Sequence, residues 1–465
     1  MKILMNITHG YQARMLLRTE ISERVREAGC ELLVLSPNAT ESYLQQELSA
    51  PGYILEQMPL RYSKVEKAVA STRAYVLMNP DLGATLHYKR ERYKRAYPTR
   101  ARVSRAINLL LGRFRSLRRL YLAAEARAFA GREFDAILER ERPDLVVAGT
   151  PGFNTFDGHV IRAAQRLGIP SVTVMLSWDN LTSKGYMSAQ PDYLLVWSDL
   201  MREEAVHYHD YRGEIIEVGA AQFDVYPKVR RTLDVEAFKR AQGVPSTASL
   251  IVWGTINNDI YPRQLDLLRR FAAELDEQQH RDVFLWVRIH PQTVSGPHRA
   301  LIEAYRALEC DRIKVELPPV QSEQLRWDLP KHDLEHLARL LTSADMVITP
   351  RSTLTIDAAC AGTPVVNLAI DRDFAVGFNY THYQGILRHD GAWVVNSFNE
   401  LMEAVAKCLA DPSNREAGRR TIVEEQLGRW YGMAGARTAS VLLTLAANRR
   451  VEHPTQVAGS DQGPR

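Results

Sequence analysis

Short, continuous apolar runs alternate with amphipathic segments along most of the 465-residue sequence. Residues 2–7 (KILMNI) lead into a helical pattern over residues 12–28, which Gly29 closes, and a second run follows at residues 30–37 (CELLVLSP). Because these runs are rich in Val, Leu and Ile and do not alternate with polar residues, they are typical of strands buried on both faces. Strands that alternate with helices in this way predict parallel sheets with right-handed crossovers, and therefore an α/β protein.

The rhythm of runs and helices restarts after residues 220–248. We therefore predict two Rossmann-like domains, at residues 1–226 and 227–420, that face one another across a cleft. The last amphipathic segment, residues 421–449, is followed by no strand and is expected to cross back over both domains. The polar residues 450–465 are expected to be disordered.

The composition is ordinary for a soluble globular protein, with 45% hydrophobic and 25% charged residues. The four cysteines are widely spaced without a metal-type pairing, which suits a reducing compartment. The first run is too short for a signal peptide, and no stretch approaches the roughly 20 apolar residues of a spanning helix. We therefore expect a cytoplasmic location, at most peripheral on the inner face of the cell membrane.

The basic charge is concentrated in an insertion in the first domain, at about residues 86–121. Residues 86–120 hold twelve Lys or Arg and one acid, Glu91. One side of a predicted helix is apolar and the other basic: Val103, Ile107, Leu110, Leu111, Phe114, Leu117 and Tyr121 oppose Arg102, Arg105, Arg113, Arg115 and Arg119, with Arg118 as the exception. Such a helix suits an anionic membrane surface, through residues 102–121, or a core-packed helix with a solvated basic face. We expect no nucleic-acid partner, because the segment has no interleaved aromatic platforms and no recognised module.

Candidate ligand-binding residues follow three strands of the second half. In open α/β sheets, ligands bind beyond the carboxyl ends of the strands. Cationic groups, hydroxyls and free backbone N–H groups at these ends suit a diphosphate, and an acid one turn into the next helix suits ribose hydroxyls. The same side chains also fit helix caps and dipole partners. They are Gly254, Thr255, Arg288, His290, Arg351, Ser352, Thr353 and, for the ribose, Asp357.

Two stretches carry a resemblance to known enzymes. Residues 343–366, SADMVITPRSTLTIDAACAGTPVV, resemble the donor-binding region of GT-B glycosyltransferases. RIHP at residues 288–291 resembles the His-Pro motif of bacterial sialyltransferases and CDP-glycerol glycerophosphotransferases, and GAAQFD at 219–224 is similar to a connector of the latter group. The resemblance implies that Asp357 binds the donor ribose and that Asp371 contacts sugar hydroxyls.

The sequence departs from the family pattern in two places. Retaining members carry a second acid eight positions before the helix acid, where this sequence has Thr349, and this favours an inverting reaction. The acidic pair with glycine of the sialyltransferases has no clear match in the first domain. The Asp-Arg-Asp run that begins at Asp371 looks like a metal motif of the other glycosyltransferase fold, but it follows a strand of the second domain, so we predict no metal site.

A general base for the acceptor hydroxyl is expected from the first domain. His9 follows the first strand, and an imidazole with an ordinary pKa suits this role. Asp179 follows another strand, with Trp178 placed to stack on a sugar and Lys184 placed to meet a phosphate. Either candidate also fits a turn, bonded to backbone or neighbouring side chains, and Asp157 is expected to cap a helix.

Together these features predict a metal-independent, inverting glycosyltransferase. It would move a sugar from a nucleotide-sugar donor, its substrate, to a bacterial surface-glycan or lipid-linked acceptor, without a further cofactor. Three alternatives remain: transfer of a polyol phosphate from a CDP-polyol, 2-epimerisation of a nucleotide sugar on the same fold, and nucleotide binding without catalysis.

Overall fold

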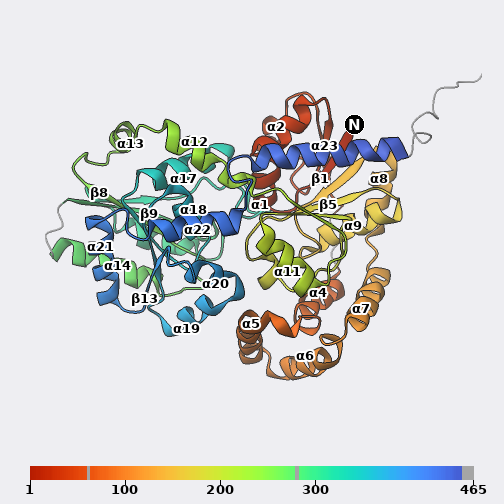
Figure 1. The fold of residues 1–465 in the computed structure, drawn as a ribbon, viewed down its shortest axis with the longest axis horizontal. Helices are drawn as coiled ribbons and strands as arrows, with labels where there is room; N and C mark the ends of the chain where they lie inside the picture. The colour runs from red at the N-terminus through yellow and green to blue at the C-terminus, as the bar shows by residue number, and fades with distance from the viewer. Residues whose placement is uncertain (60–62, 278–281, 453–465) are drawn as a thin grey trace, which may run out of the picture.

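The computed structural model describes residues 1–59, 63–277 and 282–452, which form two α/β units side by side (Figure 1). The first contains a seven-stranded sheet in the order β3-β2-β1-β4-β5-β6-β7, and every neighbouring pair is parallel. Its strands are β1 (Lys2–Asn6), β2 (Glu31–Ser36), β3 (Tyr53–Gln57), β4 (Leu145–Ala148), β5 (Ser171–Val174), β6 (Tyr193–Val196) and β7 (Glu214–Glu217).

The second unit contains a six-stranded parallel sheet in the order β10-β9-β8-β11-β12-β13. Its strands are β8 (Ser249–Gly254), β9 (Val283–Arg288), β10 (Ile313–Glu316), β11 (Met346–Pro350), β12 (Val365–Leu368) and β13 (Trp393–Val395). All six residues of β9 are buried, as the unbroken apolar run predicts. The predicted fold of two Rossmann-like domains, known as GT-B, is confirmed.

Helices connect the strands in both units. Those of the first half are α1 (Gly10–Gln12), η1 (Ala13–Leu17), α2 (Glu20–Glu27), α3 (Ser42–Glu47), α4 (Lys64–Val76), η2 (Pro80–Leu82), α5 (Gly83–Ala96), α6 (Pro98–Leu111), α7 (Arg115–Ala128), η3 (Arg132–Phe134), α8 (Asp135–Glu141), α9 (Thr155–Arg166), α10 (Asn180–Ser183), α11 (Asp199–His209) and η4 (Ala221–Phe223). Those that follow are α12 (Val225–Thr232), α13 (Val235–Ala241), α14 (Gln264–Glu277), α15 (Pro291–Ser295), η5 (Arg299–Leu301), α16 (Ile302–Arg306), α17 (Lys331–Ser343), α18 (Leu354–Ala361), α19 (Arg372–Ala375), η6 (Val376–Asn379), α20 (Thr381–Leu387), α21 (Phe398–Ala410), α22 (Glu416–Leu427) and α23 (Ala434–Glu452). None of the helices in the described ranges is both long enough and apolar enough to cross a bilayer.

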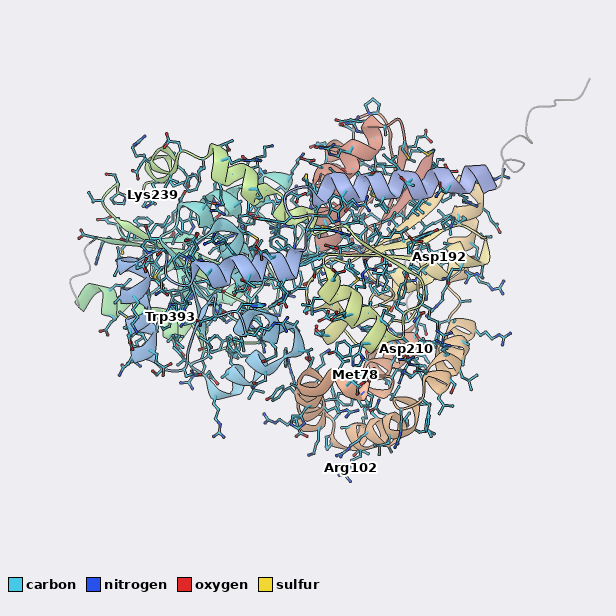
Figure 2. All side chains as sticks on the ribbon, viewed as in Figure 1. Met78, Arg102, Asp192, Asp210, Lys239 and Trp393 are labelled. Carbon is cyan, nitrogen blue, oxygen red and sulfur yellow. The ribbon has the colours of Figure 1, made fainter. Side chains whose placement is uncertain are left out.

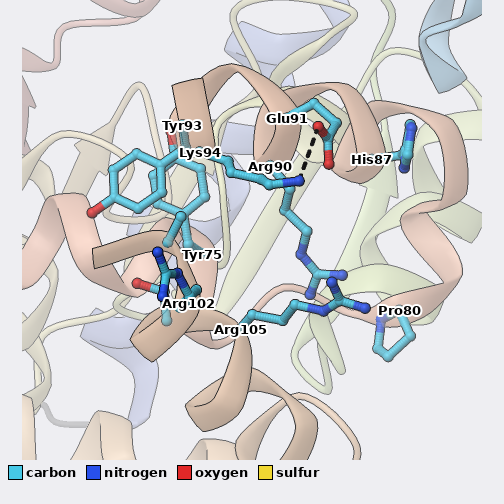
Figure 3. Close-up of a pocket in the computed structure, with 11 residues that line it drawn as sticks. Tyr75, Pro80, His87, Arg90, Glu91, Tyr93, Lys94, Arg102 and Arg105 are labelled. Atoms are coloured by element: carbon cyan, nitrogen blue, oxygen red, sulfur yellow. Dashed lines mark ion pairs between the residues drawn. The ribbon is translucent and has the colours of Figure 1, made fainter. Parts of the chain in front are cut away.

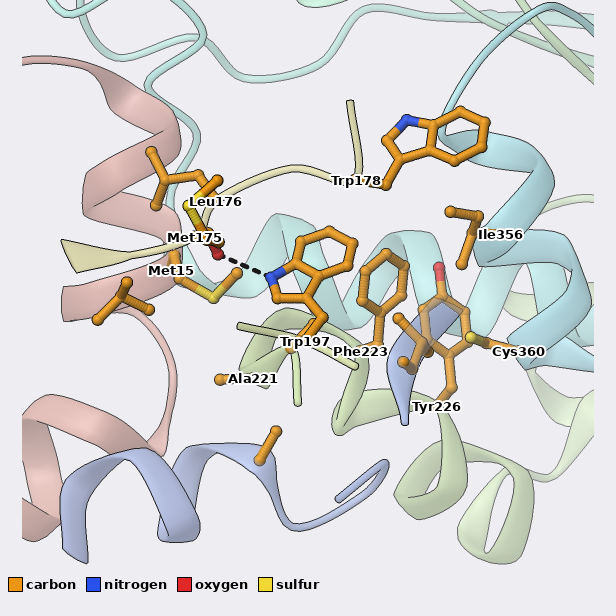
Figure 4. Packing of buried hydrophobic residues seen from close by; sticks show 14 of the residues in the cluster. Met15, Met175, Leu176, Trp178, Trp197, Ala221, Phe223, Tyr226, Ile356 and Cys360 are labelled. Carbon is orange, nitrogen blue, oxygen red and sulfur yellow. Dashed lines mark hydrogen bonds between the residues drawn. The ribbon is translucent and has the colours of Figure 1, made fainter. Parts of the chain in front are cut away.

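One apolar core runs through both units. Trp197 on the first half donates from its indole N–H to the carbonyl of Met175, at 2.7 Å. Its ring contacts Phe223, and this row of rings continues to the fully buried Tyr226. Figure 4 shows the row ending against α18 of the second half, which belongs to the same cluster. The two sheets therefore share one interior instead of meeting through a solvated linker.

The C-terminal helices also join the units. α22 packs against α18 and α20 of the second half, and α23 then crosses to the first half, where it packs on α2 (Figure 1). Asp224 fixes the crossing point, because its carboxylate accepts from the backbone N–H groups of Ala434 and Gly435 at 3.1 and 2.7 Å. The predicted crossing helix is present. It continues to Glu452, past the expected start of the disordered tail, and residues 453–465 lie outside the described part.

The basic insertion differs from the single helix that the sequence predicts. The chain bends at residues 112–114 between α6 and α7, where Gly112 lies so close to Asn108 and Met78 that a side chain would overlap them. Arg118, the exception to the basic face, is buried and donates to Asp210 at 2.5 and 2.9 Å. Figure 2 shows Asp210 where the insertion meets the rest of the first unit, and Arg102 at the outer rim.

A loop of the second half, residues 318–330, extends over the first half; we call it the strap. Gly10 donates its backbone N–H to the carbonyl of Leu325 at 2.6 Å, and a Cβ at Gly10 would overlap strap backbone. Arg18 lies where the expected helix over residues 12–28 is interrupted, and its guanidinium forms a buried ion pair with Asp328. Tyr43 donates to the other oxygen of Asp328 at 2.6 Å.

We expect Arg18→Met to destabilise the protein by about 3 kcal/mol or more, because it leaves the fully buried Asp328 without its cation. Urea unfolding followed by circular dichroism measures the change. Arg24→Met is the matched control, since Arg24 and its partner Glu20 are both about half exposed and such pairs contribute about 1 kcal/mol or less. Equal losses in the two variants would contradict the role of this ion pair.

Candidate functional site

The carboxyl ends of β9, β8 and β11 lie next to one another, because these strands are neighbours in the second sheet. Thr255, after β8, accepts a hydrogen bond from the backbone N–H of His290, after β9, at 2.8 Å. Packing explains the glycine at position 254, since a Cβ there would overlap Leu354 at the start of α18. The three strand ends of the predicted donor site thus meet at one edge of the sheet, which the first unit faces.

His290 caps α15 with its ring. Its Nδ1 accepts from the backbone N–H of Gln292 at 3.2 Å, which leaves the proton of the neutral ring on Nε2. Burial lowers the pKa of His290 to about 4, so the ring is neutral at neutral pH. His290 therefore presents an N–H donor rather than a positive charge.

His9 has the same arrangement in the first unit. Its Nδ1 accepts from the backbone N–H of Tyr11 at 3.2 Å, so Nε2 carries the proton. Burial, and then the nearby Arg326, lower the pKa of His9 to about 4. The role of general base predicted for His9 is not supported by this geometry, because the ring's lone pair is already engaged. His9 is instead a second neutral donor.

Trp327 of the strap lies between these two imidazoles. Its ring centroid is 4.9 Å from that of His9 and 5.8 Å from that of His290, edge-on in both cases. Arg326 and Trp327 both have a φ of 47°, a left-handed conformation that is uncommon outside glycine. The indole nitrogen is buried and lacks a hydrogen-bond partner among the described residues. The strap contacts hold this strained pair in place, which is typical of functional sites.

Asp179 is the centre of a charged group at the start of α10. Its carboxylate accepts from Ser177 at 2.8 Å and Ser183 at 2.6 Å, and it pairs with Lys184 at 3.0 Å. Burial alone raises the pKa of Asp179, but Lys184, His382 and these hydrogen bonds outweigh it and hold the pKa well below its ordinary value. Asp179 is therefore ionised, and while Lys184 stays paired it is a weak base.

Two side chains that the sequence did not indicate complete this group. Lys89 of α5 lies near Lys184, and burial together with Lys184 lowers the pKa of Lys89 to about 8. His382 of α20 accepts or donates with Thr182 at 3.0 Å, and burial lowers its pKa to about 4 despite the charge of Asp179. Both lie on helices with no motif around them, so only the tertiary structure brings them to Asp179.

Arg351 also reaches this group, as a cation held by aromatic rings. Its guanidinium lies over the rings of Tyr380 and Phe374, at 4.5 and 5.1 Å from their centroids. A Cβ at Gly377 would overlap this guanidinium, so glycine is required there. Its Nη1 is buried and has no hydrogen-bond partner within the described ranges. Arg351 thus keeps a donor unused beside Asp179, with which it interacts electrostatically.

Asp357 lies in the first turn of α18, as predicted. Tyr226 donates to its Oδ1 at 2.8 Å. Burial raises the pKa of Asp357 to about 6, although the charge of Arg14 opposes this change. Ser352 accepts from the backbone N–H of Leu354 at 3.2 Å, whereas Thr353 stands at the N-cap without a side-chain cap bond. The hydrogen bond from Tyr226 thus engages only Oδ1 of Asp357.

Two of the predicted site residues have structural roles instead. Arg288 is buried and pairs with Glu316 and Asp333, each at 2.5 Å, so its guanidinium is not available to a phosphate. Trp178 is 5% exposed and packs edge-on against His382 and Tyr383, at 4.9 and 5.2 Å between ring centroids. It orients these residues and has no free face on which a sugar could stack.

The remaining predicted residues take separate places. Asp371 follows β12 and lies 3.9 Å from Arg263, where its charge raises the pKa of the buried Tyr261 further. Asp157 is fully buried, and Asn6 and Gln12 donate to it. Within the described ranges, no three His, Cys, Asp or Glu side chains are grouped so that they could hold a metal ion.

Comparison with solved structures defines the fold class. A glycosyltransferase from Rickettsia africae has 10% identity and a TM-score of 0.52, over 96% of this chain and 98% of that chain. UDP-GlcNAc 2-epimerase from Neisseria meningitidis, bound to UDP-GlcNAc, has 10% identity and a TM-score of 0.55, over 96% and 100%. The same enzyme from Methanocaldococcus jannaschii, in complex with UDP-GlcNAc and UDP, has 13% identity and a TM-score of 0.53, over 95% and 99%.

The chain therefore has the GT-B fold that glycosyltransferases and UDP-GlcNAc 2-epimerases share. At these identities the likeness concerns the fold alone. No protein-family model and no curated protein matches the sequence.

We expect Glu204 to make stability depend on pH. Glu204 is buried on α11, and burial, then Asp179 and Glu203, raise its pKa from 4.5 to about 8. The folded state therefore keeps a proton that the unfolded state loses. Between about pH 5 and 8 the wild type should lose up to about 1.4 kcal/mol per pH unit relative to Glu204→Gln.

Urea unfolding at several pH values tests this expectation. The control is Asp199→Asn, which changes a carboxylate of the same helix whose side chain is 78% exposed, and it should keep the pH dependence of the wild type. If Glu204→Gln also keeps the pH dependence of the wild type, Glu204 is ionised in the folded protein and the expectation is wrong.

Proposed function

We propose that this protein is a glycosyltransferase that binds a nucleoside-diphosphate sugar between its two sheets and transfers the sugar to an acceptor hydroxyl. The observation that carries the proposal is the convergence of three cations, Lys89, Lys184 and Arg351, with the neutral donors His9 and His290. These groups come from both units and lie beyond the carboxyl ends of the strands, where α/β folds bind ligands.

The donor would lie mainly on the second unit. Asp357 offers its Oδ2 to a ribose hydroxyl, since the hydrogen bond from Tyr226 engages only Oδ1. The imidazole N–H of His290 and the unused Nη1 of Arg351 are suitable donors for phosphate oxygens. A diphosphate there would satisfy buried donors that the protein leaves without partners.

The cations also suit the departure of the diphosphate as the leaving group. When the sugar–phosphate bond breaks, negative charge grows on the leaving diphosphate, and preorganised cations stabilise that charge. Lys184 has a further role, because it pairs with Asp179. A diphosphate that draws Lys184 away raises the pKa of Asp179, which then becomes a better base for the acceptor proton. Donor binding would thereby activate the base.

An epimerase is the second candidate, favoured by the similarity of the whole chain to UDP-GlcNAc 2-epimerases. Such an enzyme needs no acceptor. Incubating the protein with a nucleotide sugar alone and following C2 by NMR tests this candidate: inversion at C2 supports the epimerase, and an unchanged sugar excludes it.

A thermal-shift panel of UDP-, CDP-, GDP- and CMP-linked ligands tests the proposal as a whole. We expect one nucleoside-diphosphate sugar to raise the melting temperature, because a ligand that binds only the folded state stabilises that state. The absence of a shift with every ligand would overturn the proposal.

Asp357→Asn should weaken binding of that nucleotide sugar by about 10- to 100-fold, because a hydrogen bond to a carboxylate contributes about 1.5–3 kcal/mol. Isothermal titration calorimetry measures the change. Asp266→Asn is the control: Asp266 lies on α14 with a 74% exposed side chain, so this variant should bind as the wild type does. Equal affinity of Asp357→Asn would remove Asp357 from the site.

Asp179→Asn should lower the transfer rate by at least about 100-fold, the usual range for loss of a general base. Its nucleotide affinity should not fall and should rise instead, since Asp179 no longer competes with the diphosphate for Lys184. Rates measured at saturating donor make this comparison. A variant that keeps the wild-type rate would exclude Asp179 as the base.

A further inference from the structure

A pocket lies in the insertion, outside the predicted donor site. It is a pocket of about 330 Å³ between α4, α5 and α6 (Figure 3). The stacked rings of Tyr75 and Tyr93, 4.1 Å apart, form part of its wall. The charged residues that line it are Arg90, Glu91, Lys94, Arg102 and Arg105.

The pocket carries a surplus of positive charge. Arg90, Lys94, Arg102 and Arg105 face one acid, Glu91, which lies 3.7 Å from Lys94. In the part of the chain that the structure describes, no carboxylate forms an ion pair with the three arginines. Several clustered guanidiniums without an acid suit an anion with several acceptor oxygens.

Two of the arginines are held close together. Figure 3 shows the guanidinium groups of Arg90 and Arg105 next to each other, and burial together with Arg105 lowers the pKa of Arg90. Arg90 is fixed by Asn108, whose side-chain N–H groups donate to the carbonyls of Val76 and Met78 at 2.9 and 3.0 Å. The like charges are thus kept together by the fold, at a cost that a bound anion removes.

Exposed apolar side chains belong to the same segment of the chain as this basic region. Of the eleven large hydrophobic residues that are exposed in the described ranges, seven lie between residues 97 and 120. Leu109 is 70% exposed, Leu120 67% and Leu110 58%, and the others are Tyr97, Val103, Ile107 and Phe114. Exposed apolar groups gathered among cations match a bilayer surface, which offers acyl chains below anionic headgroups.

The pocket is close to the predicted site. α5 carries Lys89, which reaches the Asp179 group, and Arg90, the next residue, which lines the pocket. The same helix contacts the second unit, since Thr85 donates to Thr381 at 3.0 Å and Asn379 donates to Tyr88 at 3.1 Å. A phosphate in the pocket would therefore lie about one helix diameter, roughly 10 Å, from the cations of the site.

We propose that the pocket between α4, α5 and α6 binds the phosphate group of a membrane lipid, with the exposed apolar residues of α6 and α7 inserted among the acyl chains. In the proposed transfer reaction this lipid phosphate carries the acceptor, and the short distance between pocket and site brings its hydroxyl to Asp179. This second statement rests on the proposed function, whereas the binding of a lipid phosphate does not.

Flotation with vesicles tests the pocket. The pocket variant Arg102→Gln/Arg105→Gln and the control Arg92→Gln/Arg95→Gln remove the same charge from exposed positions of the insertion, but only the first pair lines the pocket. With phosphatidylcholine vesicles that contain phosphatidylglycerol, we expect the pocket variant to lose at least tenfold more affinity than the control. Equal losses would overturn the pocket and leave only diffuse attraction between basic residues and the anionic surface.

The apolar part of the proposal has its own variant. Leu109→Ser/Leu110→Ser changes two exposed side chains and should leave the fold intact. We expect it to reduce binding to the same vesicles by more than tenfold, because two leucines no longer enter the bilayer. Binding equal to that of the wild type would show that the insertion does not enter the membrane.

Soluble ligands separate a lipid phosphate from a free one. Calorimetry with short-chain phosphatidic acid should show binding to the wild type that the pocket variant loses, and inorganic phosphate should bind at least tenfold more weakly. Equal affinity for the two ligands would make the pocket a site for free anions and overturn the proposal. The pocket variant should bind the nucleotide sugar as the wild type does. Nucleotide-sugar binding therefore tests the donor site, and lipid-phosphate binding tests the pocket independently of it.

Discussion

The buried ion pair between Arg18 and Asp328 fixes how the two sheets face each other. Both side chains are buried, so water cannot replace either partner, and Tyr43 donates to the remaining carboxylate oxygen of Asp328. Because breaking such a pair leaves a buried charge uncompensated, the strap has one stable position. That position brings Trp327 between His9 and His290, which belong to different units. The geometry of the candidate site therefore depends on a contact outside it.

Within the site, neutral donors and true cations are kept apart. His9 and His290 use one ring nitrogen to cap a helix and are neutral because they are buried. Lys89, Lys184 and Arg351 instead surround Asp179, whose charge they share. Such an arrangement binds a dianion strongly only if the ligand replaces Asp179 as a partner of the cations. Donor binding and the ionisation of Asp179 are consequently coupled.

The sequence allowed the two parallel sheets to be predicted, because unbroken apolar runs have one common explanation. The meeting of Thr255, His290 and Ser352 followed from strand order alone. The partners of a buried side chain could not be predicted in this way: Arg288 ends β9, where a ligand-binding residue could lie, yet carboxylates from β10 and α17 pair with its guanidinium. Lys89 and the left-handed Trp327 carry no local signal, since neither a motif nor a glycine marks them.

Helix α23 has a consequence for how the chain acquires its structure. Ile21 and Val25 of α2 are fully buried, and the helix that packs on α2 consists of residues 434–452. During synthesis, the first unit must therefore wait for the whole second unit before its apolar face is covered. Until then α2 presents a hydrophobic surface to other chains and to chaperones. The large sequence separation of this contact also makes its formation slow, so the two units mature together rather than one after the other.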